Sequence, residues 1–119
     1  MKVIIAGSRS IEDYHYKDLI KMINRSNYDI SEIVSGCAIG ADRLGEKYAN
    51  YKSIPIKKMP ANWNEYGKVA GHIRNKQMAD YADAAIILWD GVSPGTKNMI
   101  AHMNKLNKPY QLYLLTDEP

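Results

Sequence analysis

Residues 84–96 of the chain, AAIILWDGVSPGT, join its most apolar run to a loop that contains glycine, serine and proline. An uninterrupted apolar run of this length is typical of a strand that is buried on both faces, as in a parallel sheet. Residues 96–106 predict a helix after the loop. The stretch therefore predicts one strand-loop-helix unit of an α/β fold.

The same alternation of strands and helices continues on both sides of this unit. Further strands are expected at residues 2–6, 31–35, 54–59 and 111–115, and further helices at residues 13–26, 41–51 and 70–82. Pro55 favours an edge position for the third strand, because proline cannot donate to a sheet ladder. Residues 60–69 lack a clean period and are expected to form a loop or an irregular helix entry. The pattern predicts a single α/β domain over residues 1–119. We expect a Rossmann-like three-layer sandwich whose parallel sheet of about five strands has the order 3-2-1-4-5.

The composition excludes several classes of protein. With 45% hydrophobic and 24% charged residues, the chain is too apolar for a disordered protein. No segment approaches the roughly 20 apolar residues that cross a membrane, and the short apolar N-terminus predicts a strand instead of a secretory signal. The single cysteine, Cys37, rules out an internal disulfide and favours a reducing compartment. A net charge of +3 without a basic run suits an anionic small ligand better than nucleic acid.

Three loops that each lead from a strand into a helix carry most of the candidate ligand-binding residues. In such sheets, ligands bind beyond the carboxyl ends of the strands. The first loop offers Gly7 for a close backbone approach, the hydroxyl of Ser8 and the forked cation of Arg9. Alone, these residues fit a phosphate contact and a simple turn equally well.

The second loop contains Ser35, the two glycines Gly36 and Gly40, and Asp42. Glycines before a helix leave backbone N–H groups free at its positive end, although this spacing is not G-x-G-x-x-G and a lone pair of glycines is weak evidence. Asp42 would repel a phosphate beside it, so we expect it to hold a ribose hydroxyl or to cap the helix. Cys37 is expected to be a small packing residue.

The third loop follows the most apolar strand and contains Asp90, Gly91, Ser93, Gly95 and Thr96. Gly95 and Thr96 place N–H groups and a hydroxyl at a helix start, where a phosphate would bind. The alternative is a turn with Thr96 as the helix N-cap. Three such loops at one edge of a sheet together predict a phosphate site.

Four residues between the second and third loops complete the predicted site. Trp63, in a polar segment, is expected either to stack on a base or to lock its loop. Lys68 is expected to cover the phosphate. Arg74 is the best candidate for a functional cation, and we expect it, next to Asn75, to point toward the third loop.

The sequence predicts no dedicated metal site. The three histidines share no metal-ligand spacing. A Mg²⁺ ion accompanying nucleotide phosphates, held by Asp42 and Asp90, is the one metal alternative.

The strings SGCAIGADRLGEKYA (residues 35–49) and PANWNEYGKVAGHIRNKQMADYADAAIILWDGVSPGTKNMI (residues 60–100) resemble the YspA/YpsA-related branch of the SLOG superfamily. SLOG proteins have Rossmann-like folds and include the DprA/Smf DNA-processing proteins and the LOG phosphoribohydrolases. The resemblance implies a nucleotide or nucleotide-derived ligand. It also implies a cytoplasmic protein of a bacterial cell, with a phage-encoded protein and a bacterial conflict system among the settings that the resemblance suggests.

The LOG enzymes are similar at one further motif, which covers Arg74, Met78, Gly91, Gly95 and Thr96. The catalytic glutamate of that motif is missing, because Asn98 and Met99 stand where it would lie, and Asp90 replaces its first proline. Cleavage of an N-glycosidic bond needs a carboxylate. The LOG reaction would therefore require Asp42, Asp90 or Glu65 to take over that role.

These observations favour a protein that binds a nucleotide or phosphoribosyl-containing molecule, as a sensor or a sequestering module. One alternative is a phosphoribohydrolase resembling LOG, with Arg74, Asp42 and Asp90 as catalytic candidates. Another is a single-stranded nucleic-acid binder resembling DprA, although nucleic acid is disfavoured because no basic stripe with interleaved aromatics is present.

A homodimer or higher oligomer is expected as well. The first and third helices carry more apolar surface than one sheet face would cover, and LOG relatives dimerise through helices. In the third helix, Ile73, Gln77, Met78 and Tyr81 are expected to point inward.

Overall fold

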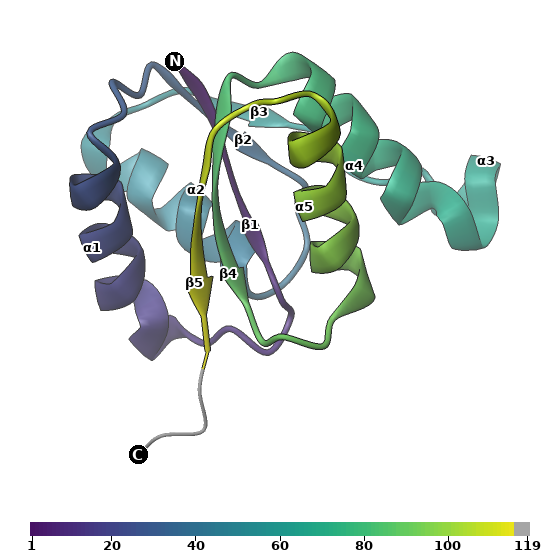
Figure 1. Ribbon diagram of the computed structural model, residues 1–119, viewed down its shortest axis with the longest axis horizontal. Helices are drawn as coiled ribbons and strands as arrows, with labels where there is room; N and C mark the ends of the chain where they lie inside the picture. Colours follow the sequence, from purple (N-terminus) through teal and green to yellow (C-terminus); the bar gives the residue numbers. More distant parts are fainter. Residues whose placement is uncertain (116–119) are drawn as a thin grey trace.

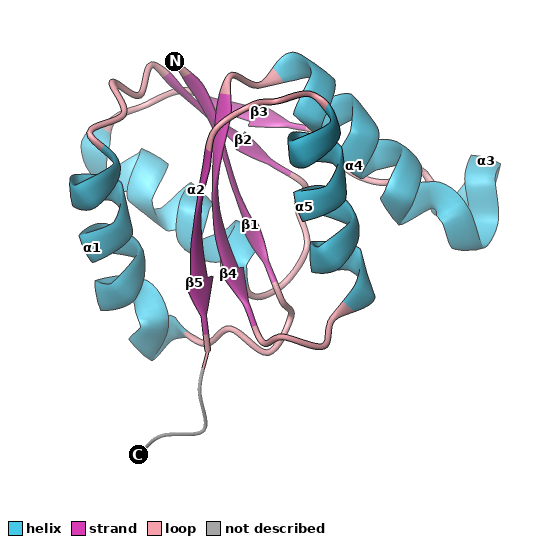
Figure 2. Ribbon diagram, viewed as in Figure 1, coloured by secondary structure: helices cyan, strands magenta, loops and turns pink. Residues whose placement is uncertain are grey.

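The computed structural model describes residues 1–115 and contains a five-stranded parallel sheet in the order β3-β2-β1-β4-β5. Figure 2 shows this sheet between two layers of helices. The strands are β1 (Lys2–Gly7), β2 (Glu32–Ser35), β3 (Ile56–Lys58), β4 (Ala84–Trp89) and β5 (Tyr110–Leu114). The helices are α1 (Tyr16–Ser26), α2 (Ala41–Lys52), α3 (Trp63–Tyr66), α4 (Ala70–Tyr81) and α5 (Pro94–Lys105), with 3₁₀ turns η1 (Asp13–His15) and η2 (Gly67–Val69). The predicted Rossmann-like α/β fold and its strand order are confirmed.

The core forms two layers, one on each face of the sheet. Alternate residues of β1 and β4, such as Ile5 and Leu88, pack with α1 and α2 on one face. Their neighbours, such as Ile4 and Ile87, pack with α4 and α5 on the other. All four side chains are fully buried, which explains why β1 and β4 are apolar without alternation.

Two glycines let the strand-end loops approach each other closely. Gly40, the N-cap of α2, has φ +83°, and a Cβ there would lie 2.4 Å from the carbonyl oxygen of Ser8. At the end of β1, a Cβ on Gly7 would lie 2.0 Å from the carbonyl oxygen of Leu88. Larger residues at either position would push apart the loops that follow β1, β2 and β4.

Residues 60–69, for which the sequence predicts a loop or an irregular helix entry, contain α3 and η2. Figure 1 shows α3 projecting beyond α4, away from the sheet. We call α3 and η2 together the arm. All of its residues are exposed, because only α4 lies beneath it. Within residues 1–115, no helix has the length and apolar character needed to cross a membrane.

Three details of the sequence prediction are wrong. Gln77 is exposed, and Asn75 is the buried polar residue of α4. Thr96 is not an N-cap, because α5 starts at Pro94 and Ser93 takes the N-cap position. Proline is favoured in the first turn of a helix, where its missing N–H costs nothing. Cys37 is exposed, with φ +63°, and does not pack.

Candidate functional site

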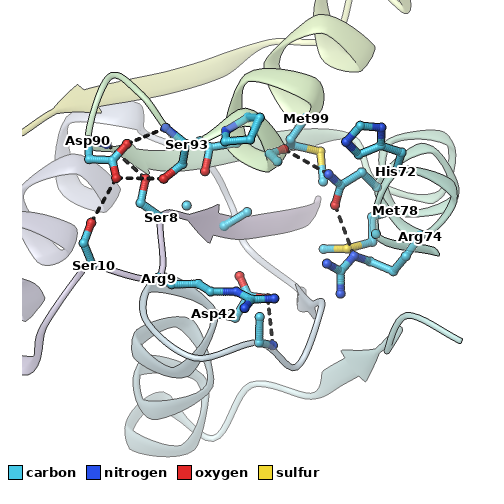
Figure 3. A pocket seen from close by; sticks show the side chains of 18 of the residues that line it. Ser8, Arg9, Ser10, Asp42, His72, Arg74, Met78, Asp90, Ser93 and Met99 are labelled. Carbon is cyan, nitrogen blue, oxygen red and sulfur yellow. Dashed lines mark hydrogen bonds between the residues drawn. The ribbon is translucent and has the colours of Figure 1, made fainter. Parts of the chain in front are cut away.

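A cavity of about 520 Å³ opens at the carboxyl ends of β1 and β4, between the first and third loops, α4 and the arm. Its volume falls in the range of small-molecule sites. Figure 3 shows Ser8, Ser10 and Asp90 on one side of it and His72, Arg74 and Met78 on the other. The predicted site residues that line it are Gly7, Ser8, Arg9, Asp42, Trp63, Lys68, Arg74, Asn75, Asp90, Ser93, Gly95 and Thr96.

Four predicted residues do not line this cavity. The hydroxyl of Ser35 is buried behind the second loop, where it donates to Glu46 over 2.6 Å. Gly36 and Gly40 support the loop from within the protein, where side chains and backbone crowd their Cα atoms. Gly91 is exposed and lies against the side chain of Leu114. All three predicted loops border the cavity, but these four of their residues lie outside its lining.

The start of α5 presents free hydrogen-bond donors to the cavity. Lys97 N donates to the carbonyl of Ser93, while the N–H groups of Gly95 and Thr96 have no acceptor among the described residues. Free N–H groups in a first helical turn carry a partial positive charge. The Thr96 side chain is only 6% exposed and lines the cavity, and its hydroxyl has no hydrogen-bond partner within residues 1–115. An anion at this helix start would satisfy all three donors.

Asp90 organises the third loop and fixes it to the first. One of its oxygens accepts from the N–H groups of Val92 (2.9 Å) and Ser93 (2.8 Å). The other accepts from the hydroxyls of Ser93 (2.7 Å) and Ser10 (3.1 Å), and Asp90 N donates to the hydroxyl of Ser8 (3.0 Å). The Ser93 hydroxyl bond is the main cause that holds the pKa of Asp90 well below its usual range. A carboxylate with both oxygens occupied in this way is poorly suited to proton transfer.

Asp42 has the opposite environment. It lies in the first turn of α2, 5% exposed, and accepts from Ala38 N over 3.1 Å. Burial raises its pKa to about 6, although the Ala38 N–H and the charge of Arg74 oppose the shift. Asp42 is not the helix N-cap, because that position belongs to Gly40. The cavity therefore contains one carboxyl group that exchanges its proton near neutral pH.

Arg74 does not point toward the third loop as expected. Its Nη1 donates to the carbonyl oxygen of Gly36 in the second loop, and its Nε donates to Oδ1 of Asn75 over 3.1 Å. Asn75 is the residue that reaches the third loop, where Nδ2 donates to the carbonyl of Gly95 (3.0 Å) and to Asn98 Oδ1 (3.1 Å). Adjacent side chains of α4 therefore fix the second and third loops relative to each other.

Gly36 leaves the space that Arg74 and Asp42 occupy. A Cβ at this position would lie 2.6 Å from Arg74 Nη1 and 2.8 Å from Asp42 Oδ2. Both groups therefore lie against the backbone of the second loop, where the guanidinium favours the ionised form of the carboxyl.

Arg9 and Lys68 supply positive charge to the cavity, and neither forms an ion pair with a described residue. Both are exposed and line the cavity, and the two ion pairs found in residues 1–115 join other residues. Trp63 lines it from the arm with 52% of its surface exposed. A Cβ on Gly71 would lie 3.5 Å from the Trp63 ring, so the ring lies over the first turn of α4.

The sequence analysis missed several lining residues. Met78 and Met99, both buried, form the apolar part of the wall, and His72, Ala38 and Pro94 lie around it. Helical spacing could have identified part of this wall from the sequence. Positions 71, 74, 75 and 78 share one face of α4, and all four line the cavity.

A model of the YspA, cpYpsA-related SLOG family matches residues 1–66. The chain belongs to this family. No curated protein and no solved structure matches the chain. The SLOG match covers β1 through α3, and therefore the first two loops and Trp63. The start of α5, with its free donors, lies beyond the matched residues.

Within residues 1–115, no three His, Cys, Asp or Glu side chains lie together in a way that could hold an ion. A cation at Asp90 would have to displace the hydroxyls of Ser93 and Ser10. Mg²⁺ would thus depend on oxygens that a ligand brings with it.

Proposed function

We propose that the chain binds a nucleotide or a nucleotide-derived, phosphoribosyl-containing molecule in the cavity at the carboxyl ends of β1 and β4. The observation that carries this proposal is the set of unpaired donors at the start of α5, which face a cavity with excess positive charge. Membership of the SLOG family supports a nucleotide-related ligand.

The phosphate binds at the N–H groups of Gly95 and Thr96 and at the Thr96 hydroxyl, with Ser8 beside them. Arg9 and Lys68 supply the countercharge, because Arg74 is already bonded to the second loop. Hydrogen bonds from charged groups to phosphate are about twice as strong as neutral ones. In this proposal Arg74 and Asn75 position the loops.

The sugar and the base extend toward Asp42 and Trp63. Asp42 lines the cavity, where a carboxyl oxygen suits a ribose hydroxyl. The Trp63 ring is half exposed at the cavity mouth and suits a stacked base. A protein that holds a nucleotide derivative in this way acts as a sensor or as a sequestering module in the bacterial cytoplasm.

One observation favours hydrolysis of an N-glycosidic bond as a second candidate function. Asp42 has a pKa of about 6 in a cavity, as general acids and bases often do. It is a better candidate than Asp90, whose oxygens are occupied, or Glu65, which does not line this cavity. Release of free base during incubation would distinguish an enzyme from a binding protein.

Calorimetric titration with AMP, ADP, ADP-ribose and NAD⁺, followed by chromatography for free base, tests the proposal. Arg9→Ala removes one charge-assisted contact, so the affinity for the ligand that binds is expected to fall about tenfold to a hundredfold. Arg43→Ala is the matched control, because Arg43 is exposed and lines a different cavity. Unchanged affinity of the Arg9 variant, or equal losses in both variants, would contradict the proposed phosphate position.

A further inference from the structure

The two edges of the sheet differ in how they are protected against pairing with another strand. At one edge, β3 is only three residues long, is preceded by Pro55 and carries Lys57 and Lys58. Short length, proline and lysine are the usual means by which natural proteins block edge pairing. At the other edge, β5 has five residues, Tyr110–Leu114, and none of them is charged.

The hydrogen bonds between β4 and β5 identify which backbone groups of β5 are free. Ala85 N donates to the carbonyl of Pro109, and Leu115 N donates to the carbonyl of Trp89. Backbone groups alternate in direction along a strand, so the odd-numbered residues of β5 face β4. Tyr110, Leu112 and Leu114 therefore direct their N–H and C=O groups outward, where no described strand pairs with them.

The side chains of the same residues are apolar and partly uncovered. Leu112 is 45% exposed and Leu114 is 52% exposed, and both lie on the α5 face of the sheet together with Tyr110, which packs against that core layer. The nearby Lys108 is turned away, because its ammonium group donates to the carbonyls of Ala79 and Ala82 at the end of α4. The edge therefore combines free backbone groups, apolar side chains and no charge.

We propose that β5 pairs with β5 of a second copy of this chain, antiparallel across a two-fold axis at Leu112. In this register Leu112 lies opposite Leu112, and Tyr110 lies opposite Leu114 of the other copy. All three outward-facing residues then form hydrogen-bonded pairs, in which both N–H···O bonds are exchanged. The cross-strand neighbours are apolar or aromatic on the α5 face, which stabilises such pairs.

The absence of charge favours a second copy over an unrelated strand. A two-fold interface places each residue near its own counterpart or a symmetry-related neighbour. A charged strand such as β3 would bring Lys58 close to like charge, whereas β5 brings none together. The strands of the two copies run in opposite directions, so their cavities open at opposite ends of the shared sheet and stay accessible.

This surface differs from the one that the sequence suggested. Within residues 1–115, the large apolar side chains that are exposed include none from α1 or α4. The apolar surface that the sequence assigned to the first and third helices is therefore small, apart from Tyr14, which lies in the predicted first helix (residues 13–26) and is 66% exposed. Leu112 and Leu114 provide the alternative.

Light scattering of the full chain at micromolar concentration tests the pairing. The wild type is expected to have twice the monomer mass, and Leu112→Lys is expected to halve it, because two lysines would meet at the two-fold axis. Tyr51→Lys is the matched control on α2, 76% exposed and at the opposite side of the sheet, and it should leave the dimer unchanged. A monomeric wild type, or a dimer that survives Leu112→Lys, would overturn the proposal.

Amide hydrogen exchange of the wild type gives a second test, which needs no substitution. Amides of residues 111 and 113 are protected by β4 in any state, whereas those of Tyr110, Leu112 and Leu114 gain protection only in the dimer. Protection of these three that increases with protein concentration supports the pairing. Rapid exchange at every concentration refutes it.

Discussion

Asp42 and Asp90 show how environment separates two carboxyl groups of one cavity. Asp90 has four donors and a lowered pKa, whereas Asp42 is buried and has a pKa of about 6. The sequence identified both residues as candidates, but it could not separate their roles. That separation depends chiefly on the Ser93 hydroxyl bond to Asp90 and on the burial of Asp42, and both arise only in the folded chain.

The raised pKa of Asp42 predicts a specific pH dependence of stability. The folded protein retains the Asp42 proton up to about pH 6, whereas the unfolded chain releases it near 3.8. The contribution of Asp42 to the free energy of unfolding is therefore fully present below pH 3.8 and is lost as the pH rises through 6. The difference between the two pKa values corresponds to roughly 3 kcal/mol. Asp90 changes the free energy of unfolding only at lower pH, because its pKa in the folded protein is lowered from 3.8.

Asp42→Asn, which cannot ionise and still accepts from Ala38 N, isolates this effect. Relative to the wild type, the variant is expected to gain little at pH 4 and up to roughly 3 kcal/mol above pH 7. Urea unfolding of both proteins between pH 4 and 8 measures the difference. A difference that stays constant with pH would show that Asp42 does not titrate in this range.

At the scale of elements, local patterns predicted most bounds to within one or two residues. The run at residues 84–89 corresponds to β4 without a change in bounds, because an apolar strand between two covered faces leaves little alternative. The predicted start of α5, Thr96, lies two residues after the observed start, Pro94. The residues around Pro94 resemble a loop in sequence, although proline is favoured in the first turn of a helix. The inward position of Asn75 was missed because its burial depends on bonds to Gly95 and Asn98 in another element.

Thr96 at the start of α5 gives a prediction for this element. Thr96→Val keeps the shape of the side chain and removes a hydroxyl that has no partner within residues 1–115. The free energy of unfolding of the free protein should therefore not fall. The affinity for a phosphate-bearing ligand should fall about tenfold, since a hydrogen bond to a charged group is lost.

Thr96→Ser is the control, because it retains the hydroxyl. Calorimetry measures the affinity of the three proteins, and thermal unfolding measures their stability. A stability loss in Thr96→Val without ligand would mean that the hydroxyl already has a structural partner. Equal affinities for valine and serine would place the phosphate elsewhere.

At the scale of the whole molecule, topology explains why the meeting of the three loops was predictable. Parallel strands place their carboxyl ends at one edge, so the loops after β1, β2 and β4 had to converge once the strand order was known. The direction of long side chains was not determined by this rule. Arg74 lies on the expected face of α4, but the carbonyl of Gly36 attracts it to the second loop instead of the third.

The central claim is that an anion of a nucleotide-derived ligand binds at the start of α5. NMR titration of the labelled protein with AMP, ADP, ADP-ribose and NAD⁺ tests it most directly, because each backbone amide reports separately. With at least one of these ligands, the account predicts saturable shifts that are largest for the amides of Gly95 and Thr96, with smaller shifts at Ser8. Amides of Arg43 and Asn50, beside the other cavity, should not move. No shift with any of the four ligands, or shifts that leave Gly95 and Thr96 unchanged, would contradict the account.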